Sequence, residues 1–117
     1  MEVTKSQKEK FNLFYETKFI KFYFKFLIHP GNIKERLLDC FDDFEYAYSL
    51  SQSEGVPSKI KKDWQKIWKE LLAKPTKSDY RPQYFSLHNT IHRKHYKSLE
   101  KYIIFFFEEY ERITKVQ

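Results

Sequence analysis

The chain has 117 residues, of which 41% are hydrophobic, 32% are charged and only two are glycine. This length favours one domain with one core, and the 12 Phe, 9 Tyr and 2 Trp argue against disorder, because disordered chains are poor in aromatics. Two glycines exclude the glycine-rich nucleotide-binding loops. The single cysteine, Cys40, excludes an internal disulfide and the multi-cysteine zinc motifs. We expect no cofactor.

The net charge of +6 is unevenly distributed along the chain. Residues 33–56 carry two basic and six acidic side chains, whereas the segments on either side are basic. A surface polarised in this way can steer a partner of either sign. The polar first ten residues show no secretory signal, and one lone cysteine is typical of a reducing compartment. We therefore expect a cytoplasmic protein.

Residues 5–28 are expected to form a long first helix, because their apolar side chains recur at spacings of three and four. One face of this helix is marked by five aromatic residues: Phe11, Tyr15, Phe19, Phe22 and Phe26. A second apolar strip lies on another face: Leu13, Ile20, Phe24 and Leu27. A helix that is apolar on two sides is either central in a bundle or keeps one face for a partner.

Two further helices are predicted in the middle of the chain. Asn32 followed by Glu35 has the spacing of a capping box, which predicts a second helix over residues 33–54. Gly55 is the expected stop of that helix. Ser58 is placed to cap a third helix, which we expect over residues 59–73.

Residues 83–115 carry an apolar stripe at helical spacing, so we expect one long last helix. Within it, residues 103–107 are apolar right around the helix, so at least one of these side chains must face away from an internal core. Short connections between four helices favour antiparallel neighbours. The predicted fold is therefore all-α: an up-down, four-helix-bundle-like single domain over residues 1–117, with long first and last helices.

Three histidines near the start of the last segment lie at i, i+4 and i+7: His88, His92 and His95. On one continuous helix they would share a face, and imidazoles four residues apart can ligate one transition metal. The carboxylate motifs that accompany helical metal sites are missing, and Arg93 beside the row would oppose a cation. We therefore assign no metal site, although the sequence alone leaves metal binding by this row open.

Arg81 and His88 are separated by six residues. This spacing resembles the Arg-x(4–6)-His motif of HEPN ribonucleases, which are helical bundles that pair two such motifs at a dimer interface. The resemblance implies that Arg81 stabilises phosphate and that His88 transfers a proton. The sequence departs from the family pattern at Pro82, which favours an extended conformation for Arg81. We keep a HEPN-like ribonuclease as an alternative and assign no catalytic residue.

Basic residues form stripes on three of the predicted helices. The stripes are Lys18, Lys21 and Lys25; Lys62, Lys66 and Lys69; and Arg93, Lys97 and Lys101. Lysines in such rows neutralise phosphates while nearby tyrosines stack on bases, which makes RNA or DNA binding an alternative function. Arginine, which usually leads phosphate and base recognition, is scarce in this chain, and rows of lysine are common on solvated helix faces.

The aromatic content exceeds what four short helices easily bury, and aromatic anchors concentrate the energy of protein interfaces. We therefore predict a small non-enzymatic interaction module, regulatory or inhibitory, that binds another protein or a second copy of itself. The predicted hydrophobic anchors are Phe24, Leu27, Ile104, Phe105 and Phe107. The predicted electrostatic guides are Lys66, Lys69, Arg93 and Lys97. Membrane contact is not expected, because the apolar residues of segment 18–28 surround the helix.

Overall fold

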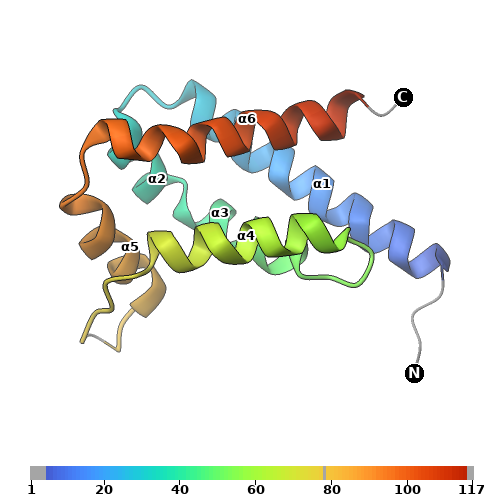
Figure 1. Cartoon of the computed structure of the whole chain (residues 1–117), viewed down its shortest axis with the longest axis horizontal. Helices are drawn as coiled ribbons and strands as arrows, with labels where there is room; N and C mark the ends of the chain where they lie inside the picture. The colour runs from blue at the N-terminus through green and yellow to red at the C-terminus, as the bar shows by residue number, and fades with distance from the viewer. Residues whose placement is uncertain (1–4, 78, 116–117) are drawn as a thin grey trace.

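The computed structural model of the chain describes residues 5–77 and 79–115, with side chains from residue 9 on except that of Phe11. Over this part of the chain the all-α class is confirmed: six α-helices and one 3-10 helix form a single globule without strands (Figure 1). The elements are α1 (Lys5–Ile28), α2 (Ile33–Asp39), α3 (Phe41–Ser51), α4 (Ser58–Leu71), α5 (Pro82–His92), the 3-10 helix η1 (Tyr96–Leu99) and α6 (Glu100–Lys115).

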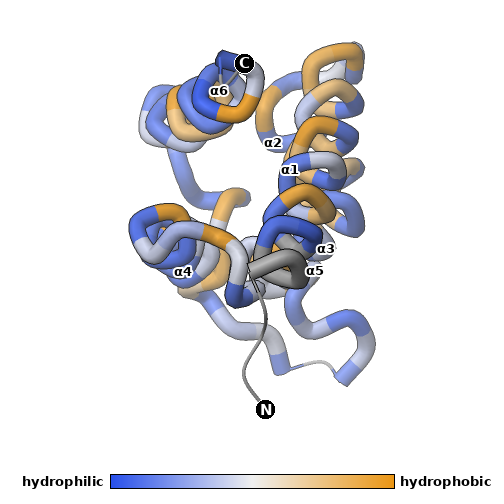
Figure 2. The backbone as a smooth tube through the Cα atoms, turned by 90° about the vertical axis from the view of Figure 1, so that its right-hand side faces the viewer, coloured by the Kyte–Doolittle hydropathy of each residue, from blue (hydrophilic) through white to orange (hydrophobic). Residues whose placement is uncertain are grey.

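The long first helix is confirmed with the bounds expected from its apolar period. Its predicted inner face is buried from Tyr15 through Phe26, while Phe11, the first member of that face, lies outside the described side chains. The buried face contacts α3 and α6. Figure 2 shows the resulting arrangement, with α1 and α3 on one side of the core and α4 and α6 on the other.

The capping box at the second helix is confirmed. The Asn32 Oδ1 accepts a hydrogen bond from the Glu35 backbone N–H at 3.0 Å, and the Asn32 N–H donates to Glu35 Oε1 at 3.4 Å. The prediction of one continuous helix over residues 33–54 is wrong, because Cys40 leaves the helical conformation (φ −96°, ψ 12°). The break separates α2, which contacts α5 and η1, from α3, which contacts α1 and α4.

The helix that precedes the connection between α3 and α4 ends earlier than expected. α3 ends at Ser51, before Gly55, where the Gln52 side-chain amide donates to the Lys61 carbonyl at 3.2 Å. The prediction that Ser58 caps the next helix is wrong, because Ser58 is the first residue of α4. The N-cap position is held by Pro57, whose side chain can neither donate nor accept a hydrogen bond.

The prediction of one long helix over residues 83–115 is also wrong. α5 ends at His92, and the chain turns before η1 and α6. No proline or glycine marks this break. The turn is held by its surroundings: Lys34 Nζ donates to the His92 carbonyl at 3.3 Å, the Ser98 hydroxyl donates to the His95 carbonyl at 2.7 Å, and Leu99 is buried.

Aromatic rings fill the core between α1, α3, α4 and α6. Phe106 on α6 lies with its ring centroid 5.1 Å from that of Phe22, 5.7 Å from Phe26 and 6.0 Å from Phe44. Trp64 on α4 is also fully buried. Most of these pairs are tilted or edge-to-face, the arrangements that the ring quadrupole favours. This packing sets α6 and α1 side by side.

Candidate interaction surface

Four of the five predicted hydrophobic anchors are exposed. On α1, Phe24 and Leu27 each leave 48% of their surface to solvent, and on α6 Ile104 leaves 55% and Phe107 leaves 50%. The expectation that at least one side chain of residues 103–107 faces away from the core is therefore confirmed. Phe24 and Leu27 project from the second apolar face of α1, opposite the part of the helix that packs on α3.

The fifth anchor, Phe105, is placed differently. Its ring meets Trp64 edge-to-face with centroids 5.5 Å apart, and the side chain is half-buried at the border of the core. An edge-on contact with a fully buried indole fixes the ring and leaves less of its surface for a partner. Phe105 therefore packs against α4 and lines the cavity between α4 and α6.

A continuous apolar surface follows the line where α1 and α6 meet. Tyr110 joins the two helices, since its ring centroid lies 5.1 Å from that of Tyr23 and 5.8 Å from that of Phe24. Residues three and four positions apart lie on the same side of a helix, so the surface continues in rows from this contact. We call it the α1–α6 strip, made of Ile20, Phe24 and Leu27 from α1 and Ile103, Phe107 and Tyr110 from α6.

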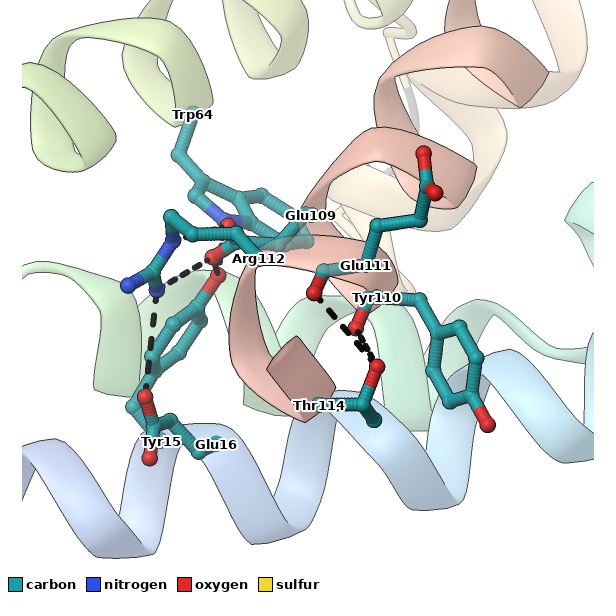
Figure 3. A network of polar contacts seen from close by, with 8 residues as sticks. All are labelled: Tyr15, Glu16, Trp64, Glu109, Tyr110, Glu111, Arg112 and Thr114. Carbon is teal, nitrogen blue, oxygen red and sulfur yellow. Dashed lines mark hydrogen bonds and ion pairs between the residues drawn. The ribbon is translucent and has the colours of Figure 1, made fainter. Parts of the chain in front are cut away.

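A buried polar network lies beneath one end of this surface (Figure 3). The Glu109 side chain is only 3% exposed, and its carboxylate accepts hydrogen bonds from the Tyr15 phenol and, at 2.6 and 3.1 Å, from the Arg112 guanidinium. The Tyr15 oxygen in turn accepts a hydrogen bond from Trp64 Nε1 at 2.7 Å. The guanidinium also lies 3.9 Å from Glu16.

The network fixes α6 against α1 and α4. Burial, followed by the charge of Glu109, raises the pKa of the Tyr15 phenol far above its ordinary value. The hydrogen bond to Glu109 raises the pKa of the Arg112 guanidinium. Sequence reasoning missed this network. The one available signal was that Glu109 continues the buried row of Tyr102 and Phe106 at helical spacing, where an acidic residue requires a partner.

The predicted guides on α4 lie in different surroundings. Lys66 borders a cavity of about 280 Å³ between α4 and α6, whereas Lys69 is simply exposed. In the same cavity Glu70 lies 2.9 Å from Lys101 and accepts from the Tyr102 phenol at 3.0 Å, and the contact with Lys101 lowers the pKa of Glu70. Lys66 therefore lies near both acidic and basic side chains.

The other two predicted guides do not form a helical stripe with Lys101. Arg93 follows the end of α5 and Lys97 lies in η1, because the expected long helix is interrupted between them. Arg93 lines a cavity of about 390 Å³, and no carboxylate is found among the described residues around it. The residues that line this cavity are Lys74, Pro75, His88, Asn89, His92 and Arg93.

The histidine row is broken by the same turn. The His88 and His92 rings stack with centroids 5.9 Å apart and planes 9° from parallel, but His95 lies beyond the helix. The prediction that all three share one helical face is therefore wrong. Over the residues that the structure describes, no group of three or more His, Cys, Asp or Glu side chains is arranged to hold a metal ion.

Arg81 and His88 have different surroundings. Arg81 has a left-handed backbone (φ 44°, ψ 58°), so the predicted extended conformation is wrong: Pro82 disfavours the right-handed helical region for this residue. Its guanidinium donates to Asp42 at 2.8 Å and lies 4.4 Å from the Tyr84 ring centroid. His88 lines the cavity beside Lys74, and Arg81 is not among the residues around that cavity.

Lys18 and Lys25 of the α1 stripe, and Cys40, make contacts within the fold. On the α1 lysine stripe, Lys25 pairs with Asp43 at 2.9 Å, and Lys18 Nζ lies 5.6 Å from the Tyr46 ring centroid. Cys40 is buried, and burial, followed by the charges of nearby aspartates, raises the pKa of its thiol. A raised thiol pKa suppresses the nucleophilic thiolate.

Within the described part of the chain, no helix combines the length and the apolar character that crossing a membrane requires. Comparisons with protein-family models, with curated proteins and with solved structures found no match.

Proposed function

We propose that this chain is a protein-interaction module, regulatory or inhibitory in kind, whose binding surface is the α1–α6 strip. The observation that carries the proposal is the contact between Phe24 and Tyr110, which joins exposed apolar surface of two helices into one area. Contiguous exposed apolar surface is typical of binding sites, and aromatic side chains supply most of the energy there.

The scaffold in this proposal is the up-down arrangement expected from the sequence, with α1, α3, α4 and α6 as its four members. Two features support a rigid platform beneath the strip: the interlocked rings around Phe106 and the network around Glu109. A surface held in place before binding loses little conformational freedom in the complex, which favours affinity. Such a module would act by covering a surface of its partner.

The test replaces the anchors by charges. Phe24→Glu and Phe107→Glu, singly and together, should abolish retention of the partner when the tagged full chain is used to recover proteins from its own cells. Tyr46→Glu on α3 is the matched control, because Tyr46 is a similarly exposed aromatic, at 52%, outside the strip. The proposal is overturned if the Phe24 and Phe107 variants, folded by circular dichroism, retain the same proteins as Tyr46→Glu.

A second candidate function, nucleic-acid binding, is favoured by one observation. The cavity beside α5 brings together Lys74, Arg93 and two imidazoles, and no carboxylate is found among the described residues around it. Phosphate contacts by such groups make binding strongly dependent on salt. If RNA or DNA is the partner, Arg93→Glu and Lys97→Glu should weaken retention on a polyanion column and reduce the salt dependence. Unchanged elution of both variants would reject it.

A further inference from the structure

The cavity beside α5 gathers positive charge from two segments of the chain. Lys74 and Arg93 are charged at neutral pH, and neither forms an ion pair within the part of the chain that the structure describes. The imidazoles of His88 and His92 lie in the same lining. Positive groups held together repel one another, and an anion among them removes that repulsion. We call this cavity the α5 groove, lined by Lys74, Pro75, His88, Asn89, His92 and Arg93.

A buried hydroxyl fixes one wall of the α5 groove. The Lys74 backbone N–H donates to Thr90 Oγ1 at 2.9 Å, and this hydroxyl donates to the Ser86 carbonyl at 2.8 Å within α5. Thr90 is only 5% exposed. The backbone of Lys74 is thereby held against α5 before any ligand binds, which reduces the conformational freedom that binding would cost.

Helix α5 forms the other wall. His88 and His92 lie one turn apart, with ring planes 9° from parallel and centroids 5.9 Å apart. Asn89 adds a side-chain amide, and Arg93 follows the last residue of the helix. The lining therefore offers ammonium, guanidinium, imidazole and amide N–H groups, and a planar guanidinium can donate to two oxygens of one phosphate.

A cation from α2 offsets the negative end of the α5 dipole. The C-terminus of a helix repels an anion, because its last carbonyls have no partner within the helix. Here Lys34 Nζ donates to the His92 carbonyl at 3.3 Å. This contact places a further positive charge at the end of α5, close to the position where Arg93 follows the helix. The end of α5 is therefore compatible with a bound anion.

We propose that the α5 groove binds a doubly charged phosphate group, either free phosphate or the phosphate of a small monoester. This inference goes beyond the proposed function, because none of the groove residues belongs to the α1–α6 strip. A monoester phosphate carries close to two negative charges at neutral pH, whereas each phosphate of a nucleic-acid backbone carries one. Among the described residues no Phe, Tyr or Trp lines the groove, so bases find no such ring to stack on. These features favour a compact dianion over a nucleic-acid strand.

Isothermal titration calorimetry of the full chain with inorganic phosphate, at constant chloride concentration, tests the site. The wild type should bind phosphate saturably, with a dissociation constant of about 1 mM or less. Lys74→Gln and Arg93→Gln should each raise that constant about tenfold, because each removes a charged donor. Lys69→Gln on α4 is the matched control, since Lys69 is exposed outside the groove, and it should leave the constant unchanged. Circular dichroism checks that every variant is folded.

Two further probes identify the source of the phosphate. Tighter binding of glycerol phosphate than of inorganic phosphate would assign the groove to a phosphorylated small molecule, and the reverse order would assign it to free phosphate. Dimethyl phosphate, a singly charged diester, should bind about tenfold more weakly than either.

Three results would overturn the phosphate proposal. These are the absence of saturable phosphate binding up to about 10 mM, unchanged binding by both Lys74→Gln and Arg93→Gln, and equal binding of dimethyl phosphate. The last result would favour the nucleic-acid alternative instead. None of them decides whether Phe24 and Phe107 retain another protein, so the two proposals fail separately.

Discussion

The phenol of Tyr15 donates a hydrogen bond to the carboxylate of Glu109, 94 residues later in the chain, and so ties α1 to α6 inside the core. Glu109→Ala would leave the Arg112 guanidinium half-buried without its main partner. Removing one member of a buried charge pair costs about 3–5 kcal/mol, whereas Tyr15→Phe, which leaves the pair of Glu109 and Arg112 in place and loses the hydrogen bonds of the phenol, should cost about 1.5–3 kcal/mol. Urea unfolding measures both. A smaller loss for Glu109→Ala than for Tyr15→Phe would contradict the charge-pair explanation.

The raised pKa of Tyr15 predicts a loss of stability at alkaline pH. In the unfolded chain a tyrosine ionises near its ordinary pKa of 10.0, but in the fold burial and Glu109 keep the phenol protonated. The folded state therefore binds more protons above that pH, and the stabilising contribution, complete below it, declines as pH rises. Urea unfolding at a series of alkaline pH values should show a steeper decline for wild type than for Tyr15→Phe. If the stability of the two proteins declined equally with pH, Tyr15 would not be the group responsible.

Two adjacent phenylalanines mark the boundary between the core and the proposed binding surface. Phe106 is fully buried, so Phe106→Ala should cost about 3–5 kcal/mol of unfolding free energy. Phe107 is 50% exposed on the strip, so Phe107→Ala should cost less than about 1 kcal/mol. Only the second variant should remain folded while losing affinity for the partner. Thermal unfolding together with the binding assay distinguishes the two roles, and comparable destabilisation by both would be inconsistent with them.

The left-handed backbone of Arg81 predicts a difference between two small replacements. Arg81→Ala and Arg81→Gly lose the same contacts with Asp42 and Tyr84, but glycine adopts a positive φ without the steric cost that Cβ brings. The glycine variant should therefore be more stable than the alanine variant by about 1 kcal/mol in denaturant unfolding.

Arg81→Ala and His88→Ala also examine the HEPN-like alternative. A ribonuclease of that kind should lose RNA cleavage in both variants, because the resemblance gives Arg81 and His88 complementary roles. In the structure Arg81 pairs with Asp42, and His88 lines a cavity that does not include Arg81, so we expect any cleavage by the purified chain to be unchanged. Loss of cleavage in both variants would favour the ribonuclease instead.

The sequence was sufficient where structure depends on neighbours along the chain. The spacing of aromatic residues predicted α1 and its buried face, because helical periodicity is a local property. The Asn32–Glu35 capping box could be predicted from the sequence for the same reason, since both partners lie within one turn. The exposure of Phe24 and Phe107 followed from counting more apolar faces than one core can cover.

The helix break after His92 and the Glu109 network depend on contacts between segments that are distant in the sequence. The helix break after His92 carries no proline or glycine, and it exists because the chain must turn there to place Leu99 and α6 in the core. The Glu109 network joins residues from three helices, so no spacing along the chain could reveal that Tyr15 and Trp64 would meet it. Local patterns specify which residues form a helix and which face is apolar. Where helices end against one another, and how a buried charge is neutralised, depends on free energies that arise only when the helices assemble.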